Sequence, residues 1–363
     1  MGSRFLAVSG RALGILLWLV CSLHLRAADD QPRMTAHFIK VGQADSTLLE
    51  FPCGAVLIDA GAQDDAFADH LLKYLDEFFD RRTDLTNTLS AVFVTHPHID
   101  HTFALRRVAE KFRIKGYVDN GQTEGSGIAN IKFVRKNAPG KGITLREAVN
   151  SEIMMGGNKA GITDGVIDPL HCDRCDPAIT VYSGQWDNDP NWSQTALNNK
   201  NNHSLVIRVD FGNTSLLFTG DLEAEGIKSL LDYYGTAARR AFDVDLYHIG
   251  HHGSRNATTQ ALLDVVTPEI AVVSVGKWDF GRQPPVTFST FAYGHPNRTV
   301  VSLVSASIPV DSVRSTPAQV MLGNASKSFT TFKVTRRVYA TDWDGDITVG
   351  ATLQRIERVT GHR

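Results

Sequence analysis

The sequence predicts an α/β protein, a single αββα domain interrupted by one long insertion. Apolar strand-like runs alternate with helix-like stretches on both sides of that insertion, which gives two similar β-then-α halves. With 363 residues the chain is long enough to bury a large core, and 42% hydrophobic and 21% charged residues are typical of a globular protein. The net charge of -2 does not indicate a nucleic-acid or membrane partner.

The first half begins with strands and then becomes helical. A helix is predicted over residues 64–80 because five large apolar side chains recur on one face at helical spacing. Strands are predicted where apolar runs are bounded by Gly or Pro. The elements expected here are strands at 37–41, 46–51, 55–59, 91–95 and 114–118 and a second helix near 103–112.

The second half repeats this alternation after the insertion at residues 121–200, which is rich in Gly, Asn, Asp and Pro. A loop of that length is functional or contains structure that the pattern does not reveal. The chain ends in a predicted hairpin between 327–339 and 347–353. The other elements expected are strands at 204–210, 215–219, 244–248 and 270–275 and helices near 224–234 and 258–266.

Residues 1–28 resemble a secretory signal peptide. Arg4 and Arg11 form a basic start, residues 12–23 are apolar, and Ala27 and Ala28 are small residues at which cleavage can occur. The alternative is a membrane anchor, but the apolar run is shorter than the roughly 20 residues that a spanning helix needs. We therefore expect a secreted or periplasmic mature domain, residues 29–363, with no stable membrane insertion.

Three cysteines follow the predicted cleavage site. An oxidising compartment favours a Cys172–Cys175 disulfide or free thiols, and His171 beside the pair raises the alternative of a small metal site. A lone CxxC is weak support for zinc. Cys53 is expected to be buried in a strand as a small apolar residue.

The segment 95–101, THPHIDH, places three imidazoles and a carboxylate directly after a predicted buried strand. Neutral imidazole and carboxylate groups are the ligands that Zn²⁺ and similar ions accept. The spacing suits two metals side by side, with His96 and His98 at one and Asp100 and His101 at the other. The alternative, in which Asp100 only caps a helix, leaves the three histidines unexplained.

Eight short pieces of the sequence, in this order, resemble the metallo-β-lactamase-fold hydrolases, and more narrowly the metallo-β-lactamase domain of ComEC-like DNA-uptake proteins. They run from about residue 35 to residue 350, so the resemblance excludes only the leader and the insertion. The pieces are VGQADS at 41–46, LIDAG at 57–61, THPHIDH at 95–101, NHSLV at 202–206, FTGD at 218–221, HHGS at 251–254, YGHP at 293–296 and TDWDG at 341–345.

The resemblance implies that Asp221 bridges the two metals and that His251 completes the second site. Asp221 also follows an apolar strand, where a carboxylate can face a site. His252 is expected to lie behind the ligands or to face substrate. His203 stands where the wider superfamily has another histidine, so it is either a ligand of the first metal or a loop residue.

Further residues are expected around the ligands. Asp59 follows a strand and is expected to orient the histidine cluster through a hydrogen bond, or else to form a turn. Gln43 and Asp45 match the family's first loop and are expected to position substrate or a ligand. His295 is expected to line the cleft or to be an ordinary loop histidine.

The implied chemistry is hydrolysis. Two divalent ions, Zn²⁺ or alternatively Mn²⁺, lower the pKa of a shared water, and the resulting hydroxide attacks phosphorus or a carbonyl carbon. Asp100 and Asp221 are the residues expected to be catalytic. Neither a GxxxxGK[ST] loop nor a GxSxG elbow is present in the sequence, which disfavours NTPases and serine hydrolases.

The predicted substrate is a phosphodiester, either DNA or a nucleotide-like small molecule. Trp186, Trp192 and Trp278 lie in loop-like segments and are candidates for stacking on bases or sugars. A lactam, lactone or other ester is the alternative within the same chemistry. A non-catalytic secreted binding module with a vestigial metal site is the alternative from another class, and no protein partner can be deduced.

Overall fold

The structure is a computed structural model of the 363-residue chain. It describes residues 1–2, 33–155, 157–277, 279–280, 288–289, 293–325 and 328–362. Apart from its first two residues, the predicted signal peptide lies outside this part of the chain, and so does Trp278. Among the described residues, none of the helices has both the length and the apolar character needed to cross a membrane.

The first β-sheet has eight strands in the order β18-β17-β1-β2-β3-β4-β5-β6. Strands β1, β2 and β3 are antiparallel neighbours, whereas β3, β4, β5 and β6 are parallel. Their bounds are β1 Arg33–Phe38, β2 Thr47–Phe51, β3 Gly54–Ile58, β4 Thr88–Val94, β5 Arg113–Asp119, β6 Thr144–Glu147, β17 Asp346–Thr352 and β18 Ile356–His362. Six of these strands come from the first half of the chain.

The second sheet has six strands in the order β16-β11-β10-β9-β8-β7. It repeats the pattern of the first sheet, because β7, β8 and β9 are antiparallel neighbours and β9, β10, β11 and β16 are parallel. Their bounds are β7 Ala178–Ser183, β8 Val206–Phe211, β9 Thr214–Phe218, β10 Leu246–His248, β11 Ile270–Val273 and β16 Val338–Ala340. The two halves predicted from the alternation are therefore two similar mixed sheets.

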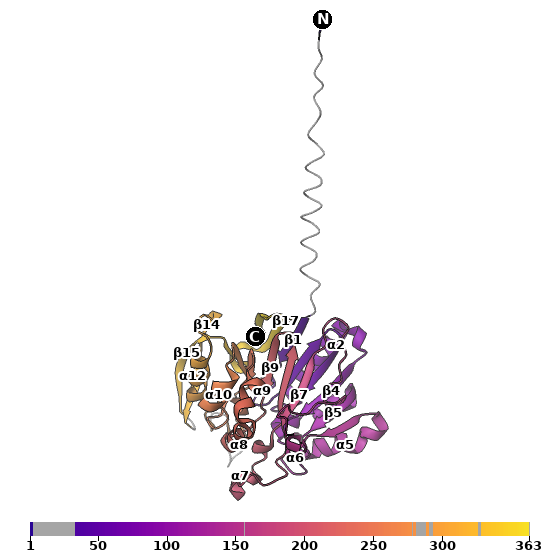
Figure 1. Ribbon diagram of the computed structural model, residues 1–363, viewed down its shortest axis with the longest axis vertical. Helices are drawn as coiled ribbons and strands as arrows, with labels where there is room; N and C mark the ends of the chain where they lie inside the picture. Colours follow the sequence, from indigo (N-terminus) through magenta and orange to yellow (C-terminus); the bar gives the residue numbers. More distant parts are fainter. Residues whose placement is uncertain are drawn as a thin grey trace. The chain divides into compact units, whose positions relative to one another are not determined.

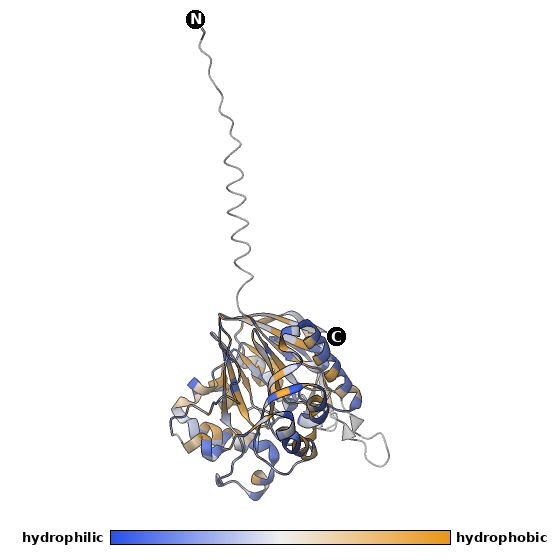
Figure 2. Cartoon of the chain, turned by 90° about the vertical axis from the view of Figure 1, so that its right-hand side faces the viewer, coloured by the Kyte–Doolittle hydropathy of each residue, from blue (hydrophilic) through white to orange (hydrophobic). Residues whose placement is uncertain are grey.

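The described residues form three apolar cores between the layers of sheets and helices that Figure 1 draws. One lies between the sheets and contains Phe38 and Phe218, whose rings stack 6.3 Å apart. The other two cores lie between the outer side of each sheet and the helices that cover it. In Figure 2 these helices carry both hydrophilic and hydrophobic residues. The helices on the first sheet are α2 Asp65–Arg81, α4 Leu105–Lys111 and α5 Ile128–Lys141, and those on the second are α8 Ala224–Tyr234, α9 Ala238–Phe242, α10 Gln260–Val266 and α12 Arg298–Ser307.

This αββα arrangement of two mixed sheets flanked by helices confirms the predicted fold class. The predicted insertion contains structure, since β6 and β7 come from it and form an edge of each sheet. The remaining elements are short helices and two hairpins. They are α3 Ile99–Thr102, α6 Asn150–Met155, α7 Gln194–Asn198 and α13 Thr341–Asp344, the pair β12 Asp279–Phe280 and β13 Phe288–Ser289, and the pair β14 Val313–Ala325 and β15 Ser328–Arg336.

The predicted closing hairpin is wrong. Strand β15 pairs with β14, whereas β17 pairs with β1 and β18. Asp344 is instead the last residue of helix α13 and Gly345 caps it, and this helix leads from the second sheet back to the first. The C-terminal strands therefore close the first sheet beside its own first strand, over a distance in sequence that a local pattern cannot reveal.

The cysteine prediction is also wrong. A disulfide joins Cys53 to Cys172, 119 residues later in the sequence, and Cys175 is a half-buried free thiol. Cys53 is not buried in a strand, since it lies exposed in the turn between β2 and β3. The bond ties that turn to the segment before β7.

Candidate metal centre

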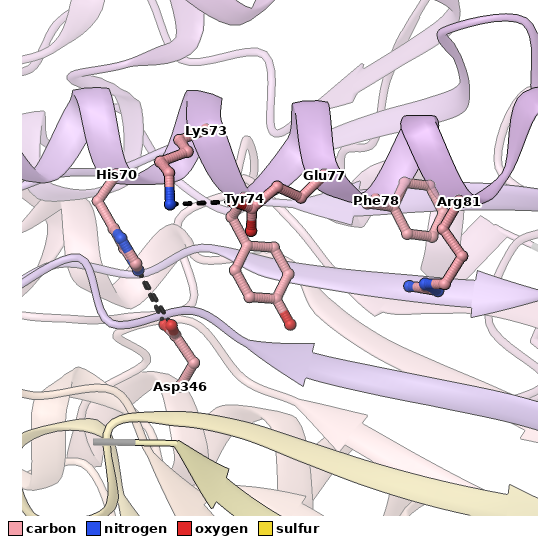
Figure 3. A pocket seen from close by; sticks show the side chains of 7 residues that line it. All are labelled: His70, Lys73, Tyr74, Glu77, Phe78, Arg81 and Asp346. Carbon is pink, nitrogen blue, oxygen red and sulfur yellow. Dashed lines mark hydrogen bonds and ion pairs between the residues drawn. The ribbon is translucent and has the colours of Figure 1, made fainter.

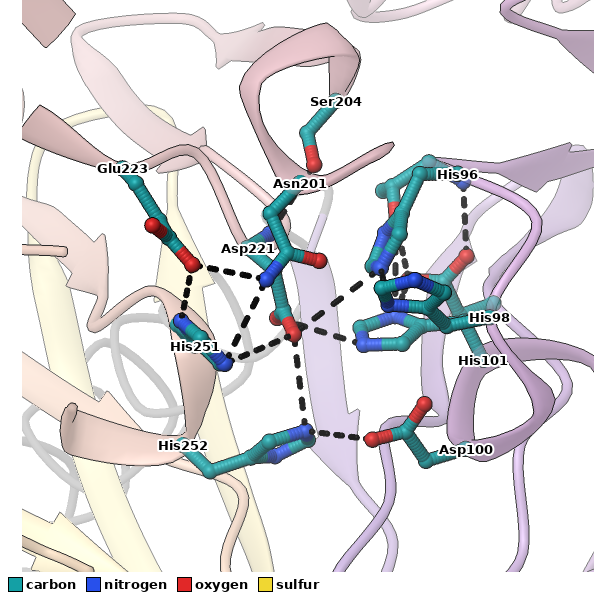
Figure 4. A network of polar contacts seen from close by, with 12 residues as sticks. His96, His98, Asp100, His101, Asn201, Ser204, Asp221, Glu223, His251 and His252 are labelled. Carbon is teal, nitrogen blue, oxygen red and sulfur yellow. Dashed lines mark hydrogen bonds and ion pairs between the residues drawn. The ribbon is translucent and has the colours of Figure 1, made fainter. Parts of the chain in front are cut away.

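The predicted ligands other than His203 meet at the carboxyl ends of strands from both sheets (Figure 4). Asp59 follows β3 and the 95–101 segment follows β4, while Asp221 follows β9. Gly220 has φ +51° in the turn before Asp221, and a Cβ on it would lie 2.9 Å from the Thr95 side chain. A glycine thus allows this turn to approach the histidine loop of the other sheet.

Asp221 lies at the middle of the cluster and is almost completely buried. Its Oδ1 is 3.2 Å from His101 Nε2, and its Oδ2 is 3.7 Å from His251 Nε2 and 3.8 Å from His252 Nε2. His96 Nε2 is 3.9 Å from the same oxygen. Burial alone would raise the pKa of Asp221, but the neighbouring imidazoles outweigh it and hold this pKa well below the usual range.

Asp59 determines which nitrogen of His101 faces Asp221. The Asp59 carboxylate accepts hydrogen bonds from His101 Nδ1 at 2.7 Å and from the backbone N–H of Thr95 at 2.7 Å. With its proton on Nδ1, His101 presents the lone pair of Nε2 to Asp221. Within the described part of the chain, this buried Nε2 makes no hydrogen bond.

His252 repeats this arrangement. Its Nδ1 donates to the Ser274 carbonyl at 2.9 Å, which leaves Nε2 directed at Asp100 Oδ2, 3.3 Å away. Burial would lower the pKa of His252, but Asp221 and Asp100 raise it to about 9. The same two opposing effects raise the pKa of His101 well above its usual value, because Asp221 and Asp59 outweigh burial.

These contacts fit a divalent cation. The donor atoms of Asp100, His101, Asp221 and His252 all lie within 4.8 Å of one another. Two imidazole lone pairs face two carboxylates, an arrangement that repels unless a proton or a metal ion lies between them. Imidazole and carboxylate groups are also the donors that Zn²⁺ accepts. The structure therefore contains a candidate metal site built from both sheets.

His96 and His98 form the other part of the cluster. His96 Nε2 lies 3.0 Å from His98 Nδ1, and the two ring centroids are 4.6 Å apart. Burial, supported by the neighbouring imidazoles, lowers the pKa of His96 well below its usual value, and burial also lowers that of His98. Both rings are thereby favoured in the neutral form that binds metals.

The adjacent histidines 251 and 252 point in different directions. Both have a left-handed backbone, with φ of 48° and 51°, which is unusual for residues other than glycine. This geometry places His252, rather than the expected His251, beside Asp100. His251 lies on the opposite side of Asp221, where its Nδ1 is 3.4 Å from Glu223 Oε1.

His203 is a loop residue in this structure, because both of its ring nitrogens are already used. Nδ1 accepts the backbone N–H of Trp186 at 3.0 Å, and Nε2 donates to the Leu197 carbonyl at 2.8 Å. Of the two alternatives for His203, ligand of the first metal or loop residue, these hydrogen bonds favour the loop residue. Trp192 packs against it, with ring centroids 5.8 Å apart.

Trp186 and Trp192 are not free stacking platforms. Trp186 is 8% exposed and packs on Trp192 at 5.3 Å between ring centroids, while Trp192 Nε1 donates to Ser229 Oγ at 2.8 Å. Both rings are used to hold the loop around His203. The prediction that these two tryptophans are candidates for stacking on bases or sugars is therefore wrong.

A cavity of about 340 Å³ opens onto the cluster. Gln43 and His295 lie together in its wall, with Gln43 Nε2 3.4 Å from His295 Nδ1, and Gln43 Oε1 accepts the Gly276 N–H. Burial, followed by the nearby His251 and His252, lowers the pKa of His295 to about 3. The lining residues are Gln43, His98, Ile99, Asp100, Ser126, Asn201, Asp221, His251, His252, Tyr293 and His295.

Asp45 lies behind the cluster and does not line this cavity. Its Oδ1 accepts from Ser274 Oγ at 3.3 Å and its Oδ2 is 3.5 Å from His248 Nε2. Burial raises the pKa of Asp45 to about 6. Asp45 thus contacts Ser274, whose carbonyl orients His252. Asp45 supports the site from behind and does not line the cavity.

Four further residues of the site were not among the predicted ones: they are Asn201, Glu223, Ser274 and Tyr293. Asn201 and Glu223 carry a sequence signal, since each lies within two residues of a piece that resembles the family. Ser274 contributes its backbone carbonyl to His252, which no side-chain pattern predicts. Tyr293 belongs to the YGHP piece, and its side chain is 54% exposed at the cavity.

The fold and the candidate metal site together define a metal-binding αββα protein, and comparison with known families agrees. The sequence model of the Metallo-beta-lactamase superfamily matches residues 39–125 and 177–277. The chain belongs to this superfamily. The match includes both halves and leaves out most of the predicted insertion.

Curated relatives match over shorter segments. The chain is 39% identical over 84 residues to Recombination protein 2 of Haemophilus influenzae, covering 23% of this chain and 10% of that protein. It is 30% identical over 105 residues to ComE operon protein 3 of Bacillus subtilis, covering 29% of this chain and 11% of that protein. The chain thus spans only a small part of these relatives.

Among solved structures, human tRNase Z, short form, is 12% identical to this chain. The comparison covers 66% of this chain and 91% of that one, with a TM-score of 0.39.

Proposed function

We propose that this protein is an exported hydrolase that uses two divalent cations, Zn²⁺ or Mn²⁺, to cleave a phosphodiester of DNA or of a nucleotide-like molecule. The observation that carries the proposal is the buried Asp221 carboxylate, which four imidazoles surround at the wall of a cavity. A purely structural cluster has no need of such ligands beside an opening.

Different residues around Asp221 would hold the two cations. His101 and His252, oriented by Asp59 and Ser274, would hold one cation together with Asp100. His96 and His98 would hold the other. Bound cations would supply a hydroxide nucleophile near neutral pH and neutralise the negative charge that develops on the substrate.

The cavity residues would bind and orient the substrate. The amides of Gln43 and Asn201 and the imidazole of His295 can donate to phosphate oxygens. Tyr293 and Ile99 offer apolar surface for a sugar or a base beside the reacting group. No Lys or Arg lines the cavity among the described residues, so the cations would have to neutralise the phosphate charge.

Two further observations support this assignment. The resemblance to ComEC-like DNA-uptake proteins, and matched relatives named as a recombination protein and a ComE operon protein, favour a nucleic-acid substrate. The Cys53–Cys172 disulfide favours an oxidising compartment outside the cytoplasm, as does the signal-like leader. The secreted or periplasmic location is part of the proposal.

A substrate panel tests the proposal. The protein, with its metal content measured, is incubated with bis-p-nitrophenyl phosphate, single-stranded DNA and nitrocefin. We expect near-stoichiometric zinc or manganese and hydrolysis of the phosphodiesters. Hydrolysis of nitrocefin alone would instead indicate a lactam or ester substrate, and a folded protein that binds no metal would indicate a binding module.

A further inference from the structure

The first of the two cation positions is short of one ligand. Asp100, His101 and His252 form one group of possible ligands with Asp221. His96 and His98, which lie on the same 95–101 segment as Asp100 and His101, form a separate pair of imidazoles. His203, the expected third imidazole, is held by Trp186 and Leu197. A side chain elsewhere in the wall must complete that position if two cations bind.

His251 lies in a suitable place. Its Nε2 is 3.7 Å from Asp221 Oδ2, the same oxygen that lies 3.9 Å from His96 Nε2. The imidazole lines the cavity, and its side chain is 20% exposed. It faces away from Asp100 because consecutive left-handed residues turn the side chains of 251 and 252 apart.

Glu223 holds His251 from behind. Its Oε1 lies 3.4 Å from His251 Nδ1 and accepts the side-chain N–H of Asn201 at 2.8 Å, while its Oε2 accepts from Asn199 at 3.0 Å. Both oxygens of Glu223 are therefore anchored by the loop before β8. Figure 4 shows the contact with Asn201. A carboxylate fixed beside Nδ1 favours the proton on that nitrogen and leaves a lone pair on Nε2. The Asn201 amide nitrogen lies 3.5 Å from this Nε2 and Asp221 Oδ2 lies 3.7 Å from it, so a bound cation would take the place of the weak Asn201 contact.

We propose that His251 is the third imidazole of the first cation position and that Glu223, anchored by Asn199 and Asn201, is its positioning residue. The inference deepens the proposed function and depends on it. The pair of adjacent histidines is then divided, with His251 serving the His96 side of Asp221 and His252 serving the Asp100 side. Glu223 touches neither cation and acts through His251.

Zn²⁺ binding to the chelator-treated protein, measured by titration calorimetry, tests this division without reference to activity. We expect two sites in the unaltered protein and one in His251→Ala and in His252→Ala. Glu223→Ala should weaken one site by about 10- to 100-fold. Glu225→Ala is the matched control, since Glu225 is exposed on the same turn of α8, and it should bind like the unaltered protein.

Combining the variants shows which site Glu223 supports. Adding Glu223→Ala to His251→Ala should change the remaining affinity little, whereas adding it to His252→Ala should weaken the remaining site. If Glu223→Ala does not fold, Glu223→Gln serves in its place, with a smaller loss in the same site.

Two results would overturn the inference. One is that His251→Ala still binds two Zn²⁺ ions with unchanged affinity. The other is that Glu223→Ala weakens the site that remains in His251→Ala. Neither result would affect the proposed hydrolase. Conversely, two sites arranged as proposed in a protein that hydrolyses no member of the panel would support the division of the histidines and contradict the proposed function.

Discussion

Asp59 and His101 share a buried hydrogen bond of 2.7 Å, and this contact turns the free nitrogen of His101 toward Asp221. The two residues are 42 positions apart in the sequence and follow neighbouring parallel strands. Asp59 itself has a left-handed φ of 58°, which places its side chain in the path of the 95–101 loop. Asp59, which is not one of the proposed ligands, thus orients His101, which is one of them.

Asp59→Asn should weaken cation binding at the position formed with Asp100, by about 10- to 100-fold. The amide can donate to His101 Nδ1, which would move the imidazole proton to Nε2 and remove the lone pair that faces Asp221. Zn²⁺ titration of the chelator-treated variant measures the change, with the exposed Asp80→Asn as control. Unchanged affinity in Asp59→Asn would show that His101 needs no such orientation.

Asp221→Ala should reduce turnover of bis-p-nitrophenyl phosphate by orders of magnitude while the fold is retained. The substitution removes the carboxylate that approaches four imidazoles, so neither cation position stays complete. Initial rates and circular dichroism are compared with those of Asp232→Ala, an exposed position on α8. Full activity in Asp221→Ala would refute the bridging role.

His203→Ala should lower the free energy of unfolding by about 1–3 kcal/mol without changing the number of bound cations. The substitution leaves the buried N–H of Trp186 and the Leu197 carbonyl without their present partner. Denaturant unfolding of the metal-free protein gives the first quantity and Zn²⁺ titration the second. A variant of normal stability that binds one cation fewer would restore His203 as a ligand.

A second cluster, between α2 and β17, predicts a pH effect on stability (Figure 3). His70 Nε2 lies 3.1 Å from both carboxylate oxygens of Asp346, and this hydrogen bond, which outweighs partial burial, raises the pKa of His70. The contact joins α2 to the start of β17. The contribution to stability is therefore complete below the unfolded pKa of about 6.5 and is lost as the pH rises through the folded value.

Denaturant unfolding of the unaltered protein and of His70→Gln at pH 6 and pH 9 measures this effect. The variant should be less stable than the unaltered protein at pH 6, and the difference should shrink at pH 9. The effect should be small, because the His70 side chain is 39% exposed. A difference that is the same at both pH values would mean that His70 contributes packing and no charge.

Much of the fold follows from local patterns. The apolar stripe of α2 and the buried runs of β3, β4 and β9 predict those elements within a few residues, because each packs a continuous apolar face on a neighbouring layer. The pairing of β17 with β1 and the bond between Cys53 and Cys172 could not be predicted, since each joins segments more than 100 residues apart.

The site likewise contains residues whose role the sequence predicts and residues whose role it does not. The density of histidine and aspartate in the 95–101 segment indicates metal chemistry without any structure. The roles of His251 and His252 depend on backbone angles that the HHGS letters do not contain. The role of His203 depends on the hydrogen bonds of its ring nitrogens. The backbone N–H of Trp186 and the carbonyl of Leu197 make these bonds, which the sequence does not reveal.

X-ray diffraction from zinc-soaked crystals, recorded on both sides of the zinc absorption edge, would show whether two cations bind around Asp221. We expect two anomalous peaks next to Asp221, one within bonding distance of His101 and His252 and the other within bonding distance of His96 and His98. A folded protein with no anomalous peak at Asp221 would contradict this expectation.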